Sequence, residues 1–358
     1  MYNILAKILR SLAIPIIHKF QPKVIAITGS AGKTSAKEAI FLVLVSKFGK
    51  SVIKSTGNLN NELGVPLAIL GYSHVPTSWQ WPFVLFYLMI KFLLIMITKK
   101  YPKILVLEYA ADKPGDIKYL TDIARPEIAV ITNIGPAHLE KFKSMKNIIY
   151  EKMSLAQNME PEGIAILNKD NKYIYNFAPK IFYQKVFYHG NDLDSASNAA
   201  MAVGKIFNIS EDKIKKILEK LEPPFGRGKI IMAKNQNIII DDTYNANPLS
   251  MKMAIKKFNG LAIKYKAKRK IICFGDMREL GQDSQKFHKE ILTLAKKSVK
   301  IIYTVGGEFA ITTNGVNNFL HSSDLVDYLK NQHLKNCIIL VKGSRAIKME
   351  KVVNLLIN

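Results

Sequence analysis

The sequence predicts an α/β protein with two domains, each built around a mainly parallel sheet. Short apolar runs typical of buried strands alternate with helix-forming stretches along nearly the whole chain, which is the pattern of parallel sheets covered by helices. A stretch rich in proline and glycine, residues 223–228, separates two such series. With 358 residues, the chain is long enough to form two buried cores.

The first series of strands and helices occupies residues 22–225. Helices are expected to begin at Lys33 and near Asn147. The apolar runs that predict its strands cover residues 24–28, 52–56, 104–110, 128–134 and 164–168. Because these runs are almost continuously apolar, we expect a parallel sheet with helices on both faces.

The second series occupies residues 226–358 and predicts a smaller, Rossmann-like α/β domain. Its apolar runs cover residues 238–241, 270–276, 300–306 and 337–343. Helices are expected from Pro248, from Ser284, near Asp324 and at the end of the chain.

The composition excludes several classes of protein. Hydrophobic residues make up 48% and charged residues 22% of the chain, which is ordinary for a globular protein and excludes wholesale disorder or many membrane spans. The two cysteines, Cys273 and Cys337, are too few for a disulfide framework or a four-thiolate zinc site. They indicate a reducing, cytoplasmic environment.

The formal net charge of +24 suits an anionic partner such as a nucleotide, a nucleic acid or a membrane surface. Alternatively, the positive charge reflects the codon usage of an AT-rich genome, since lysine has AT-rich codons. Only six of the 52 basic residues are arginine, and the others are lysine. Proteins that read nucleic-acid sequence favour arginine forks for base contacts. We therefore expect no nucleic-acid partner.

Residues 1–21 predict a basic amphipathic helix. Leu5, Leu9, Leu12 and Ile16 recur at helical spacing among basic residues, and Pro15 is expected to kink the helix. No small-residue cleavage site follows, which argues against a secretory signal. The apolar side can pack on the protein or contact a membrane, and the sequence favours neither.

An apolar insert, residues 79–101, interrupts the first domain. Its central segment, residues 81–98, contains a single charge, Lys91, and is flanked by aromatic and basic residues. A membrane crossing would place the motifs on its two sides on opposite membrane faces, although they must reach one nucleotide site. We therefore expect a helix that docks on a membrane surface or on a protein, and favour the membrane surface or a partner.

A glycine-rich loop, T-G-S-A-G-K-T, joins the first predicted strand to the helix at Lys33. Glycines let backbone N–H groups turn toward phosphate, and the start of the helix adds positive potential. The lysine can reach the β- and γ-phosphates, and the hydroxyl of Thr34 can bind Mg²⁺. The loop is shorter than the general P-loop, since Ile27 occupies the place of its first glycine. It predicts nucleotide binding by a P-loop ATPase-type central domain.

Candidate metal ligands follow two other strands of the first domain. Glu108 ends one apolar run, and Asn133 and His138 follow another. Strand ends of an open α/β sheet converge on the ligand, so we expect these residues near the glycine-rich loop. Taken singly, Glu108 can be a capping or surface carboxylate and His138 a loop histidine.

Six motifs in this order resemble the Mur ligases. They are T-G-S-A-G-K-T (28–34), G-N-L-N-N-E-L-G-V-P-L (57–67), N-I-G-P-A-H-L-E (133–140), D-D-T-Y-N-A-N-P-L-S-M (241–251), G-D-M-R-E-L-G (275–281) and V-K-G-S-R (341–345). The resemblance runs from about Lys23 to the C-terminus. It is strongest for the branch that joins D-Ala-D-Ala to UDP-N-acetylmuramoyl-tripeptide in peptidoglycan synthesis.

The resemblance implies an ATP-dependent carboxylate–amine ligase that acts through an acyl phosphate and releases ADP and phosphate. The catalytic residues it implies are Lys33, Glu108, His138, Lys152 and Arg227. Those implied for ATP are Thr28, Gly29, Ser30, Ala31, Gly32, Lys33, Thr34, Ser35, Asn133, Asp242, Tyr244, Asn245 and Asn247. Those implied for two Mg²⁺ sites are Thr34, Glu108, His138 and Lys152, with Lys152 carbamylated. Those implied for the peptide substrates are Asn60, Asn61, Lys342, Ser344 and Arg345.

The chain departs from the family pattern at its N-terminus. Family members begin with a domain that holds the UDP-sugar, whereas about 22 residues precede the first strand here, so we expect this domain to be absent. A lipid-linked muropeptide or another peptide is therefore an alternative substrate, and the enzyme can be peripheral on the inner face of the membrane. Folylpolyglutamate synthetase shares the short glycine-rich loop. An alternative outside the enzymes is a weakly catalytic, nucleotide-binding membrane scaffold.

Overall fold

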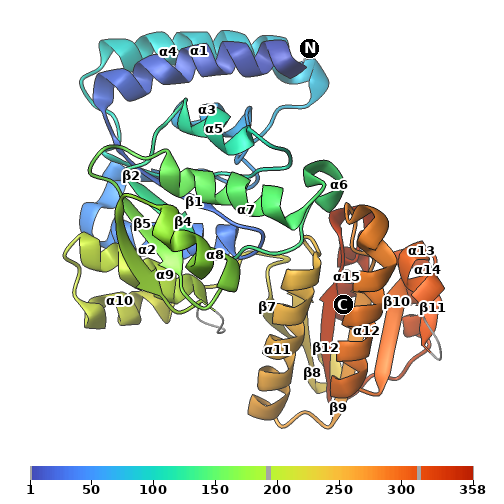
Figure 1. Ribbon diagram of the computed structural model, residues 1–358. Helices are drawn as coiled ribbons and strands as arrows, with labels where there is room; N and C mark the ends of the chain where they lie inside the picture. Colours follow the sequence, from blue (N-terminus) through green and yellow to red (C-terminus); the bar gives the residue numbers. More distant parts are fainter. Residues whose placement is uncertain (1, 191–194, 313–315, 358) are drawn as a thin grey trace. The chain divides into compact units, whose positions relative to one another are not determined.

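The structure is a computed structural model that describes residues 2–190, 195–312 and 316–357. It divides into two compact units (Figure 1). Unit 1 contains Met1–Ile134 and Ser144–Leu221, and unit 2 contains Gly135–Lys143 and Glu222–Asn358. Each unit is an α/β assembly around a six-stranded sheet, which confirms the predicted fold class.

The sheet of unit 1 is entirely parallel. Its strands, in spatial order, are β2 (Val52–Lys54), β3 (Ile104–Glu108), β1 (Lys23–Thr28), β4 (Ile128–Ile131), β5 (Ile164–Asn168) and β6 (Gln184–Tyr188). β1 and its neighbours β3 and β4 are buried along nearly their whole length, so their carboxyl ends meet in the middle of one sheet edge. The edge strand β6 was not predicted, because it begins with exposed Gln184 and Lys185.

Helices cover both faces of this sheet, as predicted. On one face, Ile25, Ile27 and Val106 of the sheet pack against Ile40 and Val43 of the helix that follows the glycine-rich loop. The helices of this face are α2 (Lys33–Phe48) and α9 (Ser195–Ile206), with α10 (Glu211–Leu218) packed on both. The other helical segments of the sheet region are α3 (Gly64–Ile69), α5 (Asp116–Thr121), α7 (Met145–Met153), α8 (Lys172–Phe177), η1 (Gly49–Ser51), η3 (Ser154–Gln157) and η4 (Ala178–Lys180).

Two long helices, α1 (Tyr2–Phe20) and α4 (Trp81–Ile97), lie side by side over α3 (Figure 1). A short turn, η2 (Ser78–Gln80), precedes α4. The apolar stripe of α1 is buried at Leu5, Leu9, Ala13 and Ile16, and α1 continues as one helix through Pro15. The apolar stripe of α1 therefore packs on the protein, which was one of the two alternatives, the other being contact with a membrane. The outer side of α4 remains exposed.

The sheet of unit 2 is mixed. Its strands, in spatial order, are β11 (Asn317–Phe319), β10 (Ile301–Val305), β9 (Arg269–Gly275), β12 (Cys337–Lys342), β8 (Asn237–Asp242) and β7 (Lys229–Ala233). All neighbours are parallel except β7 and β8. The two edge strands β7 and β11 were not predicted: β11 is three residues long and begins with two asparagines, whereas β7 contains an apolar run, residues 230–233, that was not recognised as a strand.

Alternate residues of these strands build the two cores of unit 2. Ile240 and Phe274 point to α11 (Pro248–Lys264) and α12 (Ser284–Ser298), whereas Ile239 and Val341 point to α14 (Ser322–Lys330) and α15 (Glu350–Ile357). The remaining short elements are α6 (Leu139–Phe142), α13 (Gly307–Thr312), η5 (Lys234–Gln236), η6 (Gly281–Asp283) and η7 (Arg345–Ile347).

Candidate active site

The glycine-rich loop connects β1 to α2 and packs against the residues that follow β4. The amide of Ser30 donates to the carbonyl of Asn133 at 2.6 Å, and Ala31 forms an antiparallel bridge with the same residue. Gly29 has a φ of +152°, and a Cβ at this position would lie 2.1 Å from Oγ1 of Thr132. The loop can therefore lie this close to β4 only with glycine at this point.

The start of α2 brings two predicted nucleotide ligands to the loop. Gly32 precedes the helix in the left-handed conformation, with a φ of +85°. Lys33 Nζ donates to the carbonyl of Gly29 at 2.9 Å, so the amine lies over the loop. Ser35 is half-buried in the same turn of α2, and Thr28 ends β1 with its hydroxyl donating to the carbonyl of Tyr109 at 2.8 Å. The first turn thus presents backbone amides and an amine to one place.

Glu108 ends β3, next to β1, and its side chain is 2% exposed. The hydroxyl of Thr34 donates to Glu108 Oε2 at 2.9 Å, and Asn60 Nδ2 donates to Oε1 at 3.0 Å. The predicted ligands Thr34, Glu108 and Asn60 therefore meet in one group, although they come from separate stretches of the sequence.

Lys37 belongs to this group and was not predicted. Its side chain is fully buried, with Nζ 3.8 Å from Glu108 Oε2 and 3.5 Å from Glu38 Oε1. Among the described residues, Nζ has no hydrogen-bond partner. The signal in the sequence was its position one helical turn after Lys33, which places both amines on the same side of α2.

Lys152 is buried in α7, with 1% of its surface exposed. Burial, assisted by the positive charge of Lys33, lowers its pKa from 10.5 to about 7. The adjacent Glu151 accepts hydrogen bonds from the amides of Gly115 and Ile117 at 2.8 and 2.7 Å, so it anchors the start of α5. The amine of Lys152 is thus held in a form that is largely uncharged above neutral pH.

The side chain of Asn133 also indicates that a ligand binds at the glycine-rich loop. Its Oδ1 accepts a hydrogen bond from Asn168 Nδ2 at 2.9 Å. Its Nδ2 is buried and has no hydrogen-bond partner among the residues that the structure describes. A buried donor without a partner is costly, and a polar ligand atom at the loop would satisfy it.

Two predicted residues make contacts outside this group. Asn61 Oδ1 accepts from the amide of Gly64 at 2.9 Å, at the start of α3, and its Nδ2 donates to the hydroxyl of Tyr2 at 3.4 Å. His138 lies in the segment that groups with unit 2, where its Nδ1 is 2.5 Å from Glu279 Oε2. This contact lowers the pKa of Glu279, with burial opposing it.

In unit 2, the carboxyl ends of β8 and β12 gather predicted residues. Asp242 and Lys342 are neighbours across the two strands, and Lys342 Nζ is 2.7 Å from Asp242 Oδ2. Lys342 Nζ also donates to the carbonyl of Asn245 at 2.9 Å. Lys342 is 2% exposed, so the ion pair is largely shielded from water.

The other predicted residues of this region lie in the loop after β8, except Arg227, which precedes β7. The guanidinium carbon of Arg227 lies 3.6 Å from the ring centre of Tyr244, a cation–π contact. Asn247 caps α11: its side chain accepts from the amide of Ser250 at 2.8 Å, and Pro248 follows in the first turn. Asn247 therefore has a structural role whether or not a nucleotide is bound.

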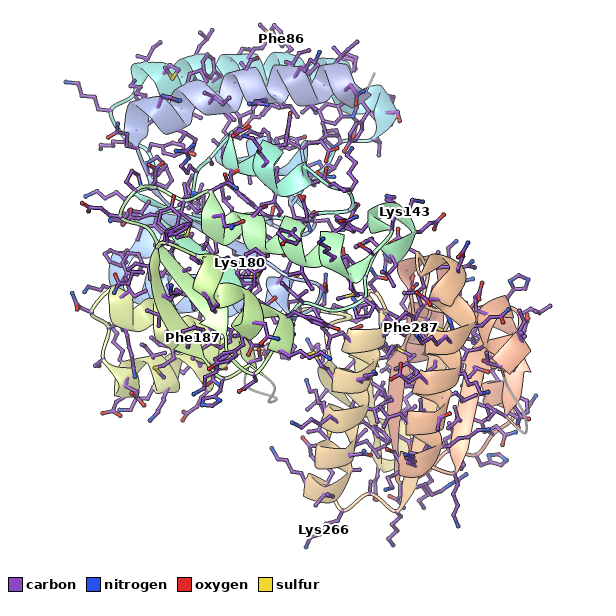
Figure 2. The ribbon with its side chains drawn as sticks, in the orientation of Figure 1. Phe86, Lys143, Lys180, Phe187, Lys266 and Phe287 are labelled. Carbon is purple, nitrogen blue, oxygen red and sulfur yellow. The ribbon has the colours of Figure 1, made fainter. Side chains whose placement is uncertain are left out.

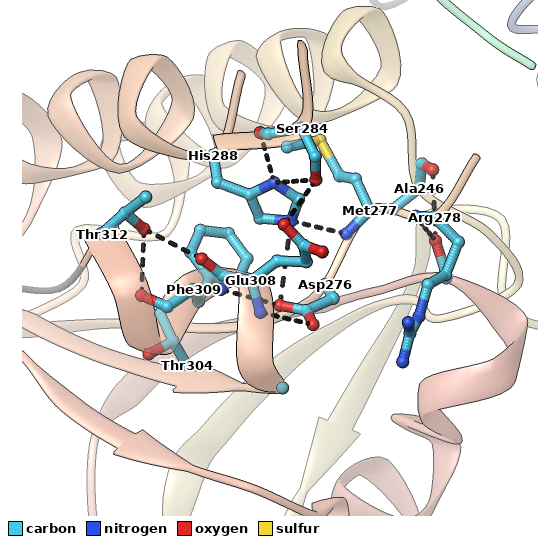
Figure 3. Close-up of polar contacts among 12 residues, drawn as sticks. Ala246, Asp276, Met277, Arg278, Ser284, His288, Thr304, Glu308, Phe309 and Thr312 are labelled. Atoms are coloured by element: carbon cyan, nitrogen blue, oxygen red, sulfur yellow. Dashed lines mark hydrogen bonds and ion pairs between the residues drawn. The ribbon is translucent and has the colours of Figure 1, made fainter. Parts of the chain in front are cut away.

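The loop after β12 is tied to the motif that follows β9 (Figure 3). The hydroxyl of Ser344 accepts a hydrogen bond from the amide of Arg278 at 2.9 Å. Asp276 is 1% exposed and accepts from the amides of Glu308 and Phe309, both at 3.0 Å, so it fixes the start of α13. Arg345 is 68% exposed, and its guanidinium is 3.8 Å from Glu350.

His288 of α12 completes this polar cluster in unit 2 (Figure 3). Its Nε2 accepts from the amide of Met277 at 3.0 Å, which leaves Nδ1 to donate to the carbonyl of Ser284 at 2.8 Å. Burial lowers the pKa of His288, in keeping with a neutral ring. The G-D-M-R-E-L-G motif thus positions loops around the carboxyl edge of the sheet.

The residues of unit 1 fit a magnesium nucleotide. No group of three or more His, Cys, Asp or Glu in the described parts of the chain could hold a metal ion by itself, which is unlike an all-protein zinc or calcium site. Mg²⁺ is commonly held by one or two protein oxygens together with phosphate and water. The carboxylate of Glu108 and the hydroxyl of Thr34, beside amides that face the loop, match that pattern.

Two family models match the chain. The model of the Mur ligase middle domain matches residues 87–215, and the model described as Mur ligase, glutamate ligase domain matches residues 226–349. The first match runs from within α4 to within α10 in unit 1, and the second covers all six strands of the sheet of unit 2.

Known proteins are similar over almost the full length of the chain. The UDP-N-acetylmuramoyl-tripeptide–D-alanyl-D-alanine ligase of Buchnera aphidicola is 31% identical over 385 residues, which cover 95% of this chain and 77% of that protein. The MurF ligase from Thermotoga maritima, solved in complex with ADP, is 26% identical with a TM-score of 0.80, covering 98% of this chain and 83% of that one. A bifunctional folylpolyglutamate synthase/dihydrofolate synthase, at 15% identity, a TM-score of 0.67 and coverage of 98% and 93%, shares the fold. The chain belongs to the Mur ligase family.

Proposed function

We propose that this chain is an ATP-dependent ligase that joins D-Ala-D-Ala to UDP-N-acetylmuramoyl-tripeptide in peptidoglycan synthesis, releasing ADP and phosphate. The names of its relatives support this reaction. The observation that carries it is the group around Glu108, where Thr34, Asn60 and Lys37 surround one buried carboxylate at the start of α2.

In this proposal, unit 1 binds the phosphates of ATP. Backbone amides of the loop and of the first turn of α2, other than that of Ser30, and the amine of Lys33 hold the β- and γ-phosphates, and Asn133 Nδ2 gains an acceptor on the nucleotide. In the predicted domain division, residues 22–225 bind the phosphates and residues 226–358 supply the remaining nucleotide contacts.

Thr34 and Glu108 would hold one Mg²⁺, and His138 with Lys152 would support a second. When bound, Mg²⁺ supplies positive charge that screens the phosphates and favours phosphoryl transfer to the substrate carboxylate. The resulting acyl phosphate is attacked by the amine of D-Ala-D-Ala, which forms the amide and expels phosphate. The residues of the chain position these partners and offset their charge.

Carbamylation of Lys152 is part of the proposal. A carbamate forms when an uncharged amine attacks CO₂, and the lowered pKa of Lys152 supplies that amine near neutral pH. The modification replaces a cation by an anion in a buried position, which would favour metal binding.

Residues of unit 2 complete the proposed assignments. Asp242 would bind the ribose, and this new contact would replace part of its ion pair with Lys342. Tyr244, Asn245 and Asn247 would line the adenosine site. Arg227 would stabilise the transferring phosphoryl group. For the substrates we assign Asn60 and Asn61 to the nucleotide-peptide, and Lys342, Ser344 and Arg345 to the acyl phosphate or the incoming dipeptide.

The decisive test is phosphate release with UDP-N-acetylmuramoyl-tripeptide and D-Ala-D-Ala, with the ligated product identified by mass spectrometry. L-Ala-L-Ala is the matched control for the dipeptide, and K33A and E108A are expected to lower turnover at least 100-fold. ATP hydrolysis that no acceptor stimulates would refute the ligase assignment. It would leave the nucleotide-binding scaffold as the better description.

A lipid-linked muropeptide is the second candidate substrate, and the exposed side of α4 is the observation that favours it. We propose that the enzyme works in the cytoplasm, peripheral on the inner face of the membrane, through residues 1–20 and 81–98. The same phosphate-release assay with a lipid-linked muropeptide in detergent compares the two substrates directly. A lower KM for the lipid-linked form identifies it as the preferred substrate.

A further inference from the structure

The α4 helix has an uncharged apolar face that points away from the rest of unit 1. Phe83, Phe86, Ile90, Leu93 and Ile97 recur every three or four residues along this face, and their exposed fractions are 71%, 68%, 45%, 58% and 80%. Figure 2 shows Phe86 on the outer side of the helix. Together with η2, the helix is long and apolar enough to cross a membrane, and 17% of its most apolar window is buried. A continuous apolar surface of this kind marks a site of interaction.

The single charge of α4 does not lie on this face. Lys91 is half-buried, and its Nζ donates to the carbonyl of Gly71 at 2.7 Å on the protein side of the helix. The same side is buried through Trp81, Val84 and Leu88. The outer face of α4 is therefore free of charge along its whole length.

The two helices at this face, α1 and α4, carry basic but no acidic side chains. Residues 1–37 and 63–107, which include both α1 and α4, contain no aspartate or glutamate. Lys7, Lys99 and Lys100 are exposed, and Lys19 donates to the carbonyls of Met96 and Thr98 at the end of α4. An apolar face with a basic border is complementary to a phospholipid surface that carries negative headgroups.

We propose that α4, with α1 beside it, docks flat on an anionic phospholipid bilayer. The apolar face of α4 enters the boundary between headgroups and acyl chains, and the neighbouring lysines contact lipid phosphates. Trp79, which is 72% exposed, lies at the headgroup level, where tryptophan is favoured. This inference rests on the membrane location proposed above and is independent of the ligase chemistry.

Several contacts favour a flat orientation over a crossing. A crossing would place Lys91 in hydrocarbon, away from Gly71. The chain then returns to the core of unit 1: Tyr101 stacks on Phe20 with ring centres 5.0 Å apart, and β3 begins at Ile104. Both flanks of α4 are thus held by one folded body.

The test is flotation of the full chain with vesicles of phosphatidylglycerol and phosphatidylethanolamine, compared with vesicles of phosphatidylcholine alone. We expect binding to the anionic vesicles that weakens in high salt. F86D/L93D is expected to lower the partition coefficient at least about 100-fold, because each carboxylate opposes entry into the lipid. F182D is the matched control, since Phe182 is 99% exposed in unit 1 outside α1 and α4.

Lysine substitutions separate the charge contribution from the apolar one. K99Q/K100Q is expected to lower binding to anionic vesicles about tenfold, whereas K216Q/K220Q, on and just after α10, leaves it unchanged. For the orientation, I90C can carry a fluorescent label, because Cys273 and Cys337 are both buried. Quenching by shallow and not by deep spin-labelled lipids is expected, and deep quenching would overturn the flat orientation.

Two outcomes overturn the inference itself. One is an active ligase that binds neither type of vesicle. The other is a concentration-dependent dimer in lipid-free buffer that F86D/L93D abolishes, because it would assign the face to a second copy of the chain. Vesicle binding by a protein without ligase activity would instead refute the proposed reaction and leave this inference standing.

Discussion

Replacing Lys152 by methionine tests whether the interior of unit 1 holds this amine uncharged. The pKa of Lys152 is lowered from 10.5 to about 7, chiefly by burial. The amine therefore loses its proton near pH 7 in the folded protein and near pH 10.5 in the unfolded chain. Between these values the unfolded chain binds one more proton than the folded protein. The contribution of Lys152 to stability is therefore least favourable below pH 7 and improves as the pH rises.

The magnitude follows from the width of this window. Each pH unit within it changes the free energy of unfolding by about 1.4 kcal/mol. Methionine has a similar volume and no charge, so the variant lacks this dependence. We expect K152M to be more stable than the wild type at pH 6.5, and its advantage to shrink by about 2–3 kcal/mol between pH 7 and pH 9.

The assay is urea denaturation followed by tryptophan fluorescence, because both tryptophans of the chain, Trp79 and Trp81, belong to unit 1. Buffers are depleted of CO₂, so that carbamylation does not replace the amine. K146M is the matched control, since Lys146 is exposed on the same helix. A stability difference between K152M and the wild type that stays constant from pH 6.5 to pH 9 would refute the reasoning.

Three further substitutions test other contacts of the site. G29A is expected to weaken ATP binding at least tenfold in calorimetry, because its Cβ would meet Thr132 at 2.1 Å; unchanged affinity would contradict the close approach of the loop. K37M should destabilise unit 1 by about 3–5 kcal/mol, since it leaves the buried carboxylate of Glu108 without its ion-pair partner, and should lower the Mg²⁺ concentration for half-maximal activity; unchanged stability or a higher Mg²⁺ requirement would contradict this. D242N should destabilise unit 2 by about 2–4 kcal/mol in thermal unfolding, and D242N/K342M should recover most of the loss if the buried ion pair is its cause.

The sequence was sufficient for the parts of the fold that rest on buried strands. Runs such as residues 104–108 are apolar at every position before the terminal carboxylate, because both faces of a central parallel strand are covered. The edge strands β6 and β11 lack this signal, because β6 begins with two exposed polar residues and β11 has only three residues. The edge strand β7 does carry an apolar run, residues 230–233, and was missed despite it.

For the candidate site, the motifs located the strand ends but not the contacts between them. The meeting of Thr34, Asn60 and Glu108 follows from the order of β3 and β1 in the sheet, which no local pattern encodes. Lys37 was missed because a lysine on a helix is normally exposed, and its burial results from packing of α2 on the sheet. The roles of Asn61 and Asn247 as helix-start acceptors were equally open, since the same side chains suit caps and ligands.

The charges in unit 1 indicate an order for binding of metal and nucleotide. Lys33, Lys37 and Lys152 influence the region of the buried carboxylate of Glu108, and Asp112, Glu151 and Asp116 act on Lys152 with the opposite sign, so the region becomes more positive when Lys152 is protonated. These amines repel a divalent cation that arrives alone, whereas a nucleotide brings negative charge that offsets them. Titration with Mn²⁺, followed by electron paramagnetic resonance, is therefore expected to detect little binding without ATP at pH 6.5. Binding should be stronger at pH 8.5 with bicarbonate, where Lys152 is uncharged or carbamylated, and K152M should abolish the effect of bicarbonate. Equal Mn²⁺ affinity with and without nucleotide at pH 6.5 would show that the lysines do not govern metal entry.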